Sequence, residues 1–314
     1  MLYIILGAIV LALLIFAVII PRCSAQTSGE GSEEASLPSA ESVEPSEDAT
    51  PVNSDGATPR TDALNAILGE ETADKLIAQA ETNADALWIA SHPEEYAFEG
   101  STVQWKILKL AADEPAALPY VREFPSKYPA ETQTLDADLA MSEEDYENTV
   151  FKTDTPHLYQ WDRRWAQTEY SATTFGLTGC GPTSFAMVVQ GLTDNEVTPY
   201  EMAVYAQEHG YMSQYDGTSV QLFYNEAEAF GLSCRDMAFD SSNIRGALES
   251  GQLIIANLGP GYFTRTGHFF VLTGVAEDGR VIINDPYSKE RSTQLWDVDL
   301  IISESQGLYA FSKL

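Results

Sequence analysis

Cysteine, histidine and basic residues are all scarce in this chain of 314 residues. Three cysteines cannot build the disulfide framework that holds many small secreted domains together. The four histidines and three cysteines are scattered without zinc-ligand spacing, so we expect no metal and no other cofactor. With 17 Lys and Arg against 47 Asp and Glu, the net charge is −30. A chain this acidic repels phosphate backbones, which excludes nucleic acid as a partner.

The excess of acidic residues is not confined to one tail. Residues 61–314 carry 39 acidic and 15 basic side chains, so the folded part is expected to present an acidic surface. At roughly 150 residues per domain, the length allows one large domain or two modest ones.

The N-terminal segment, residues 1–25, is predicted to be a membrane anchor or an uncleaved signal. Met1 to Ile20 contains no charged residue, and about 20 such residues suffice to cross a hydrocarbon core of ~30 Å. A cleavable signal usually starts with a positive charge and has a shorter apolar region. Because Cys23-Ser24-Ala25 offers small residues at a cleavage point, secretion after signal cleavage is the alternative.

Residues 26–60 are rich in Ser, Glu, Pro, Ala and Gly and contain hardly any large apolar residue. Such a segment cannot bury enough surface to fold, so we predict a disordered acidic stalk. An anchor followed by a stalk indicates a single-pass protein of the cell membrane whose body lies outside the cytoplasm.

The rest of the chain divides into two parts. Residues 61–154 have a helical apolar pattern that fades into a polar linker, which predicts a small helical subdomain. Residues 155–314 are rich in aromatic side chains, with helix signals first and strand signals later. Strands are predicted at 253–258, 268–273 and 281–283, the last two joined by a turn at Asp278-Gly279. This order indicates an α+β fold.

Three residues of the second part form a candidate nucleophilic site. Cys180 precedes an apolar helix, whose N-terminus favours the thiolate that attacks carbonyl carbon. His268 opens a predicted strand, and Asp285 ends the strand that returns beside it. A carboxylate in that place accepts a hydrogen bond from the imidazole and fixes its tautomer.

The predicted hairpin does not easily bring His268 and Asp285 together. A two-residue turn at Asp278-Gly279 places Asp285 opposite Leu272, on the correct face but four residues out of register, or roughly 13 Å. A bulge, a longer turn or strong twist is then required. Asn284, on the other face in that register, is the alternative orienting residue.

Four motifs together resemble the bacteriocin-processing-like cysteine peptidases, which are papain-like enzymes related to double-glycine leader peptidases. They are YQWDRRW at 159–165, GCGPTS at 179–184, GHF at 267–269 and NDPY at 284–287. The resemblance implies a papain-like fold, with Cys180 as nucleophile, His268 as base and acid, and Asp285 as orienter. It also implies that the Gln160 amide stabilises the oxyanion together with the backbone N–H of Cys180.

The expected function is therefore an extracytoplasmic thiol peptidase that acts on peptide or protein substrates through an acyl-enzyme. Two alternatives stay open: an amidase or endopeptidase of cell-wall peptides, and an inactive surface module that binds peptide or wall. Cys234 is expected to be a plain buried thiol, and His157 a surface residue near the start of the domain.

Overall fold

The computed structural model describes residues 57–98, 102–129, 135, 146, 148, 150–215 and 217–314. The predicted anchor, nearly all of the predicted stalk and most of the predicted linker therefore lie outside the described residues. Within these ranges, no helix combines the length and the apolar character needed to cross a membrane. The described residues all belong to one compact unit, residues 49–314.

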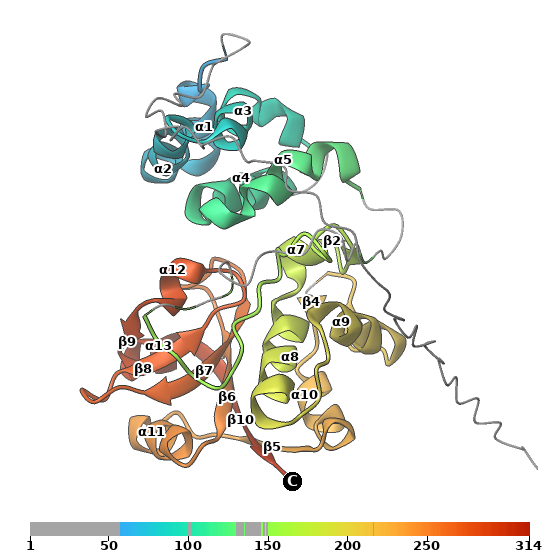
Figure 1. The fold of residues 1–314 in the computed structure, drawn as a ribbon, viewed down its shortest axis with the longest axis vertical. Coiled ribbons are helices and arrows are strands. Elements are labelled where there is room, and N and C mark those ends of the chain that lie inside the picture. Colours follow the sequence, from blue (N-terminus) through green and yellow to red (C-terminus); the bar gives the residue numbers. More distant parts are fainter. Residues whose placement is uncertain are drawn as a thin grey trace, which may run out of the picture. The chain divides into compact units, whose positions relative to one another are not determined.

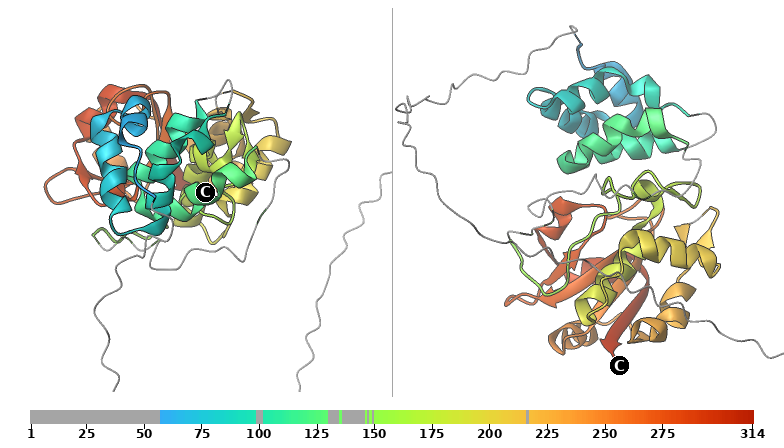
Figure 2. Two further views of the ribbon diagram at one scale, coloured as in Figure 1. Left: turned by 90° about the horizontal axis from the view of Figure 1, so that it is seen from above. Right: turned by 45° about the vertical axis from the view of Figure 1, so that its right-hand side comes forward.

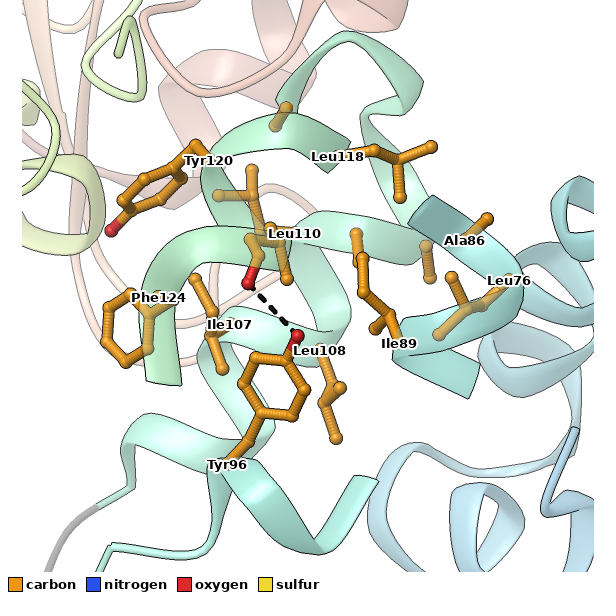
Figure 3. Close-up of a cluster of buried hydrophobic side chains, with 14 of the residues drawn as sticks. Leu76, Ala86, Ile89, Tyr96, Ile107, Leu108, Leu110, Leu118, Tyr120 and Phe124 are labelled. Atoms are coloured by element: carbon orange, nitrogen blue, oxygen red, sulfur yellow. Dashed lines mark hydrogen bonds between the residues drawn. The ribbon is translucent and has the colours of Figure 1, made fainter. Parts of the chain in front are cut away.

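The first part of this unit is a bundle of helices, as the apolar pattern predicts (Figure 1). Gly69 separates the first two helices with a positive φ of 83°, and the Asn83 side chain caps the third by accepting two backbone N–H groups. Figure 3 shows the apolar side chains between the helices, with the Tyr96 hydroxyl donating to the carbonyl of Val121 at 3.0 Å. The helices are α1 (Thr61–Leu68), α2 (Glu70–Ala80), α3 (Ala84–Ser91), α4 (Val103–Asp113) and α5 (Leu118–Lys127).

The helical bundle shares its core with the start of the second part. Tyr159 and Trp161 are buried in the same hydrophobic cluster as the bundle helices. The Tyr120 hydroxyl also hydrogen-bonds the Thr174 hydroxyl at 2.8 Å in a buried contact. Because these contacts are buried, the two parts stabilise each other.

The second part is built on an antiparallel sheet of six strands in the order β5-β10-β6-β7-β8-β9 (Figures 1 and 2). Two pairs of short strands and several helices complete it. The strands are β1 (Glu169–Tyr170), β2 (Thr173–Thr174), β3 (Met212–Ser213), β4 (Gly217–Thr218), β5 (Leu232–Asp236), β6 (Leu253–Leu258), β7 (His268–Val275), β8 (Val281–Asn284), β9 (Leu295–Trp296) and β10 (Ser305–Lys313). The helices are α7 (Phe175–Thr178), α8 (Cys180–Leu192), α9 (Pro199–Glu208), α10 (Gln221–Glu226), α11 (Ser241–Glu249), α12 (Lys289–Ser292) and α13 (Val298–Glu304).

Helices cover both faces of the sheet. Alternate residues of a strand point to opposite faces, so β6, which is apolar throughout most of its length, contributes to a core on each side. Leu253 and Ile255 of β6 pack in the cluster formed with α8, α9 and α10. Ile254 and Ala256 of the same strand pack in the cluster formed with α11 and α13. The structure confirms the predicted α+β class, and the strands predicted at 253–258, 268–273 and 281–283 are β6, β7 and β8.

The β7–β8 hairpin differs from the predicted register. Val275 pairs with Val281, so the turn is one residue longer than expected, and the pairing shifts again between Leu272 and Gly274 at a bulge. Val271 then pairs with Asn284, and continuing this register places Asp285 opposite Phe270. Each irregularity moves Asp285 one residue closer to His268. Asp285 therefore lies two residues out of register with His268 instead of four. Because the total shift is an even number of residues, its side chain still points to the same face of the sheet as that of His268.

Candidate active site

Cys180 is the first residue of α8, a helix of 13 residues. Its half-buried thiol lies at the positive end of the helix macrodipole. Gly181 is required next to it because a Cβ at that position would come within 2.7 Å of the Cβ of Thr218. The close approach of β4 thus fixes the start of the helix and the position of the thiol.

His268 is the first residue of β7 and its side chain is buried. Its Nε2 donates to Oδ1 of Asp285 at 2.6 Å, which leaves Nδ1 for the thiol. Burial lowers the pKa of His268, but the Asp285 carboxylate and the Cys180 thiol outweigh it and raise the pKa to about 9. The imidazole is therefore charged at neutral pH.

Asp285 is fully buried, and each of its polar groups has a partner. Oδ1 also accepts the backbone N–H of Tyr287 at 2.8 Å, and Oδ2 accepts from the Arg291 guanidinium at 3.1 Å. Burial raises the pKa of Asp285, but His268 and Arg291 together hold it well below its usual range. The carboxylate is thus ionised and held in one orientation beside the imidazole.

The backbone of Asp285 is held by His157 and Ser292, for which the sequence pattern indicates no role in the site. Its N–H donates to the Ser292 hydroxyl at 2.9 Å, and its carbonyl accepts from Nε2 of His157 at 2.8 Å. His157 is buried, so the expectation that it lies at the surface is wrong. Burial lowers the pKa of His157 to about 4, which keeps the ring neutral and able to donate through Nε2 while Nδ1 faces the Tyr159 hydroxyl at 3.3 Å.

Asn284 does not contact the imidazole in the way the alternative prediction requires. Its amide donates to the carbonyls of Thr155 and Pro156, at 3.2 and 3.1 Å. It therefore holds the start of the second part against β8. Asp285 is the residue that the longer turn and the bulge bring to His268.

Gln160 lines the same cavity as Cys180 and His268. Its backbone N–H donates to the carbonyl of Pro286 at 2.9 Å, which ties it to the segment after Asp285. One N–H of its amide donates to the carbonyl of Gly176 at 2.9 Å, so the orientation of the side chain is fixed. Among the described residues, the amide nitrogen makes no second hydrogen bond and the buried amide oxygen makes none.

Cys234 lies on β5 and does not line the cavity that contains Cys180. Burial, with a smaller effect of Asp236, raises its pKa to about 12. Cys234 is therefore a protonated thiol at neutral pH that lies away from the candidate site. No three side chains of the His, Cys, Asp and Glu types gather into a potential metal site within the described ranges.

A search of curated proteins finds no match. Among solved structures, the peptidase domain of Streptococcus ComA, a bi-functional ABC transporter involved in a quorum-sensing pathway, is similar at 20% identity and a TM-score of 0.35. The alignment covers 44% of this chain and 93% of that domain. The family model described as "Peptidase_C39 like family" matches residues 152–311, more than half of the chain and the whole of the site described above. The chain therefore belongs to the Peptidase_C39 like family.

Proposed function

We propose that the protein is a cysteine peptidase that hydrolyses peptide bonds, with Cys180 as nucleophile, His268 as acid and base, and Asp285 as the orienting residue. One observation carries the proposal. The thiol at the N-terminus of α8 lines the same cavity of about 680 Å³ as an imidazole whose far nitrogen is bonded to a buried carboxylate.

In the acylation step, the Cys180 thiolate attacks the carbonyl carbon of the substrate, and the carbonyl oxygen becomes an oxyanion. The backbone N–H of Cys180 and the free N–H of the Gln160 amide are the donors for that oxyanion. When the intermediate collapses, the C–N bond breaks and the His268 imidazolium gives its proton to the leaving amine. A thioester on Cys180 remains.

In the deacylation step, neutral His268 takes a proton from water, which attacks the thioester carbonyl. The carboxylic acid product leaves, and the imidazolium and thiolate pair is restored. Asp285 stays ionised throughout and stabilises the imidazolium form of His268.

The proposal is tested with the full chain and a peptide library. We expect cleavage by the wild-type protein, an increase in protein mass equal to the acyl fragment when the reaction is quenched early, and neither result with Cys180→Ala. A Cys234→Ala variant is the matched control and should cleave normally. Cleavage that survives in Cys180→Ala would disprove the nucleophile assignment.

We further propose that residues 1–25 anchor the protein in the membrane and that residues 26–60 hold the enzyme away from it, on the extracytoplasmic side. The support is the uncharged run from Met1 to Ile20 followed by a segment that cannot fold. Fractionation should find the chain in membranes, and mild trypsin treatment should release a stable fragment that begins after Arg60. A mature protein that is free in the medium and starts at Gln26 would show instead that the segment is a cleaved signal.

A further inference from the structure

The described residues that line the cavity at the candidate site carry a charge opposite to that of the chain. Of its described lining residues, four are Lys or Arg and none is Asp or Glu. The whole chain has 47 acidic and only 17 basic residues, so this composition is a local exception. The four basic residues are Lys106, Lys109, Arg265 and Arg291.

Two of the four are already neutralised by carboxylates that do not line the cavity. Lys109 pairs with Asp113, and Arg291 pairs with Asp285. Within the described part of the chain, neither Lys106 nor Arg265 pairs with a carboxylate, so both keep their charge available to a ligand.

Lys106 belongs to α4, outside the segment that matches the family model. Glu114, which follows this helix, is buried and accepts the backbone N–H of Lys289 at 3.0 Å. Ile107 and Leu108, next to Lys106, are buried in the core that the bundle shares with Tyr159. The wall that carries Lys106 is therefore fixed in place beside the site.

Arg265 lies on the segment between β6 and β7 and reaches the α4 wall. Its guanidinium lies over the Trp105 ring of α4, 4.7 Å from the ring centroid. The segment is held by Glu304, which accepts the backbone N–H groups of Tyr262 and Phe263 at 2.6 and 3.2 Å. Arg265 and Lys106 thus come from two different segments and line the same cavity, with the Arg265 guanidinium held against the residue next to Lys106.

Given the proposed peptidase function, we propose that α4 forms one wall of the substrate cleft and that Lys106 and Arg265 select peptides with an acidic side chain near the scissile bond. The acidic surface of the chain repels such peptides only weakly, because at physiological salt a charge is screened beyond about 8 Å. Inside the cleft, the two unpaired cations act at short range, where screening is weaker. The preference therefore resides in the cleft and should decrease as salt increases.

The test compares matched peptide pairs in which Glu is placed in turn at each position from four residues before to four residues after the cleaved bond, with Gln as the neutral partner. We expect kcat/KM to be higher for Glu at one or two positions, by roughly tenfold at low salt. Lys106→Gln and Arg265→Gln should each remove most of this ratio while cleavage of the Gln peptides continues. Lys106→Glu should reverse the ratio, whereas Lys313→Glu, which makes the same change of charge outside the cavity, should leave it unchanged.

The same peptides, labelled with a fluorophore, are bound to Cys180→Ala, so that the preference is measured without turnover. Equal affinity for the Glu and Gln peptides would overturn the proposal, even if the wild-type protein cleaves peptides. Preferential binding of the Glu peptides without cleavage by the wild-type protein would disprove the peptidase function but support an acid-selective cleft. Thermal unfolding of each variant shows that a lost preference reflects the charge and not the fold.

Discussion

Replacing Asp285 by Asn tests the electrostatics of the site most directly. The variant keeps the size of the side chain and removes the charge that opposes the effect of burial on His268. In the wild-type protein, the pKa of His268 is raised from 6.5 to about 9, which corresponds to about 3 kcal/mol of preference for the imidazolium. Without the carboxylate, only Cys180 still opposes the effect of burial, so we expect the pKa of His268 to fall well below 9.

The shift also predicts how stability depends on pH. Because the folded protein holds the His268 proton more tightly than the unfolded chain, this contribution is complete below pH 6.5 and is lost as the pH rises through about 9. The wild-type free energy of unfolding should therefore fall by about 3 kcal/mol across this window relative to that of Asp285→Asn. Other titrating groups contribute to both proteins, so the difference isolates this pair.

The pKa of His268 is measured by NMR titration of the histidine ring carbons, with His268→Ala to assign the signal. The free energy of unfolding is measured with urea at pH 6 and pH 9. Asp285→Asn also leaves the Arg291 cation unpaired, so the double variant Asp285→Asn/Arg291→Gln separates that effect. Asn284→Ala is the matched control, because its amide holds backbone carbonyls and not the imidazole. The reasoning is refuted if the pKa of His268 stays near 9 in Asp285→Asn, or if Asn284→Ala lowers it as much.

Three further predictions follow from the contacts around the site. Gln160→Ala should lower kcat by ~10²–10³ with little change in the rate of thiol alkylation, because one oxyanion donor is lost; equal turnover would remove Gln160 from the site. Iodoacetamide at about pH 6 should label Cys180 before Cys234, whose pKa is raised to about 12; peptide mapping that finds the reverse order contradicts the nucleophile assignment. Burial raises the pKa of Glu114 from 4.5 to about 8, so the folded protein holds this proton more tightly than the unfolded chain. As the pH rises from 4.5 to 8, the free energy of unfolding of the wild-type protein, measured in urea, should therefore fall by about 3–5 kcal/mol relative to that of Glu114→Gln. Parallel pH profiles of the two proteins would show that Glu114 is ionised in the fold.

The parts of the fold that sequence could predict are those with strong local signals. The long apolar run after Cys180 and the apolar segments that became β6, β7 and β8 are all found where the pattern places them. The strand β10, which lies between β5 and β6, is not recognisable in the same way. Its apolar run from Leu308 to Phe311 is short, and such a run does not distinguish a strand from a buried helix. The edge strand β5 has an apolar residue mainly at its start.

The site was predictable to the same extent, and for the same reason. Cys180, His268 and Asp285 stand out through neighbouring glycines, a helix start and strand ends. His157, Ser292 and Arg291 carry no such local signal, because they act through contacts with Asp285 that only the folded chain brings about. The proposed roles of Lys106 and Arg265 depend on the packing of the helical bundle against the second part, which cannot be predicted from local sequence patterns.

The bulge in β7 makes the hairpin sensitive to insertions and deletions. With the observed turn and no bulge, a regular ladder would place Asp285 opposite Val271, and its side chain would then point to the face away from His268. Inserting or deleting one residue between the two strands, where this shifts their register by one residue, also turns the Asp285 side chain away from His268. We therefore expect proteins of this type to tolerate length changes in the hairpin only in pairs, so that the spacing of 17 residues between His268 and Asp285 varies by even numbers.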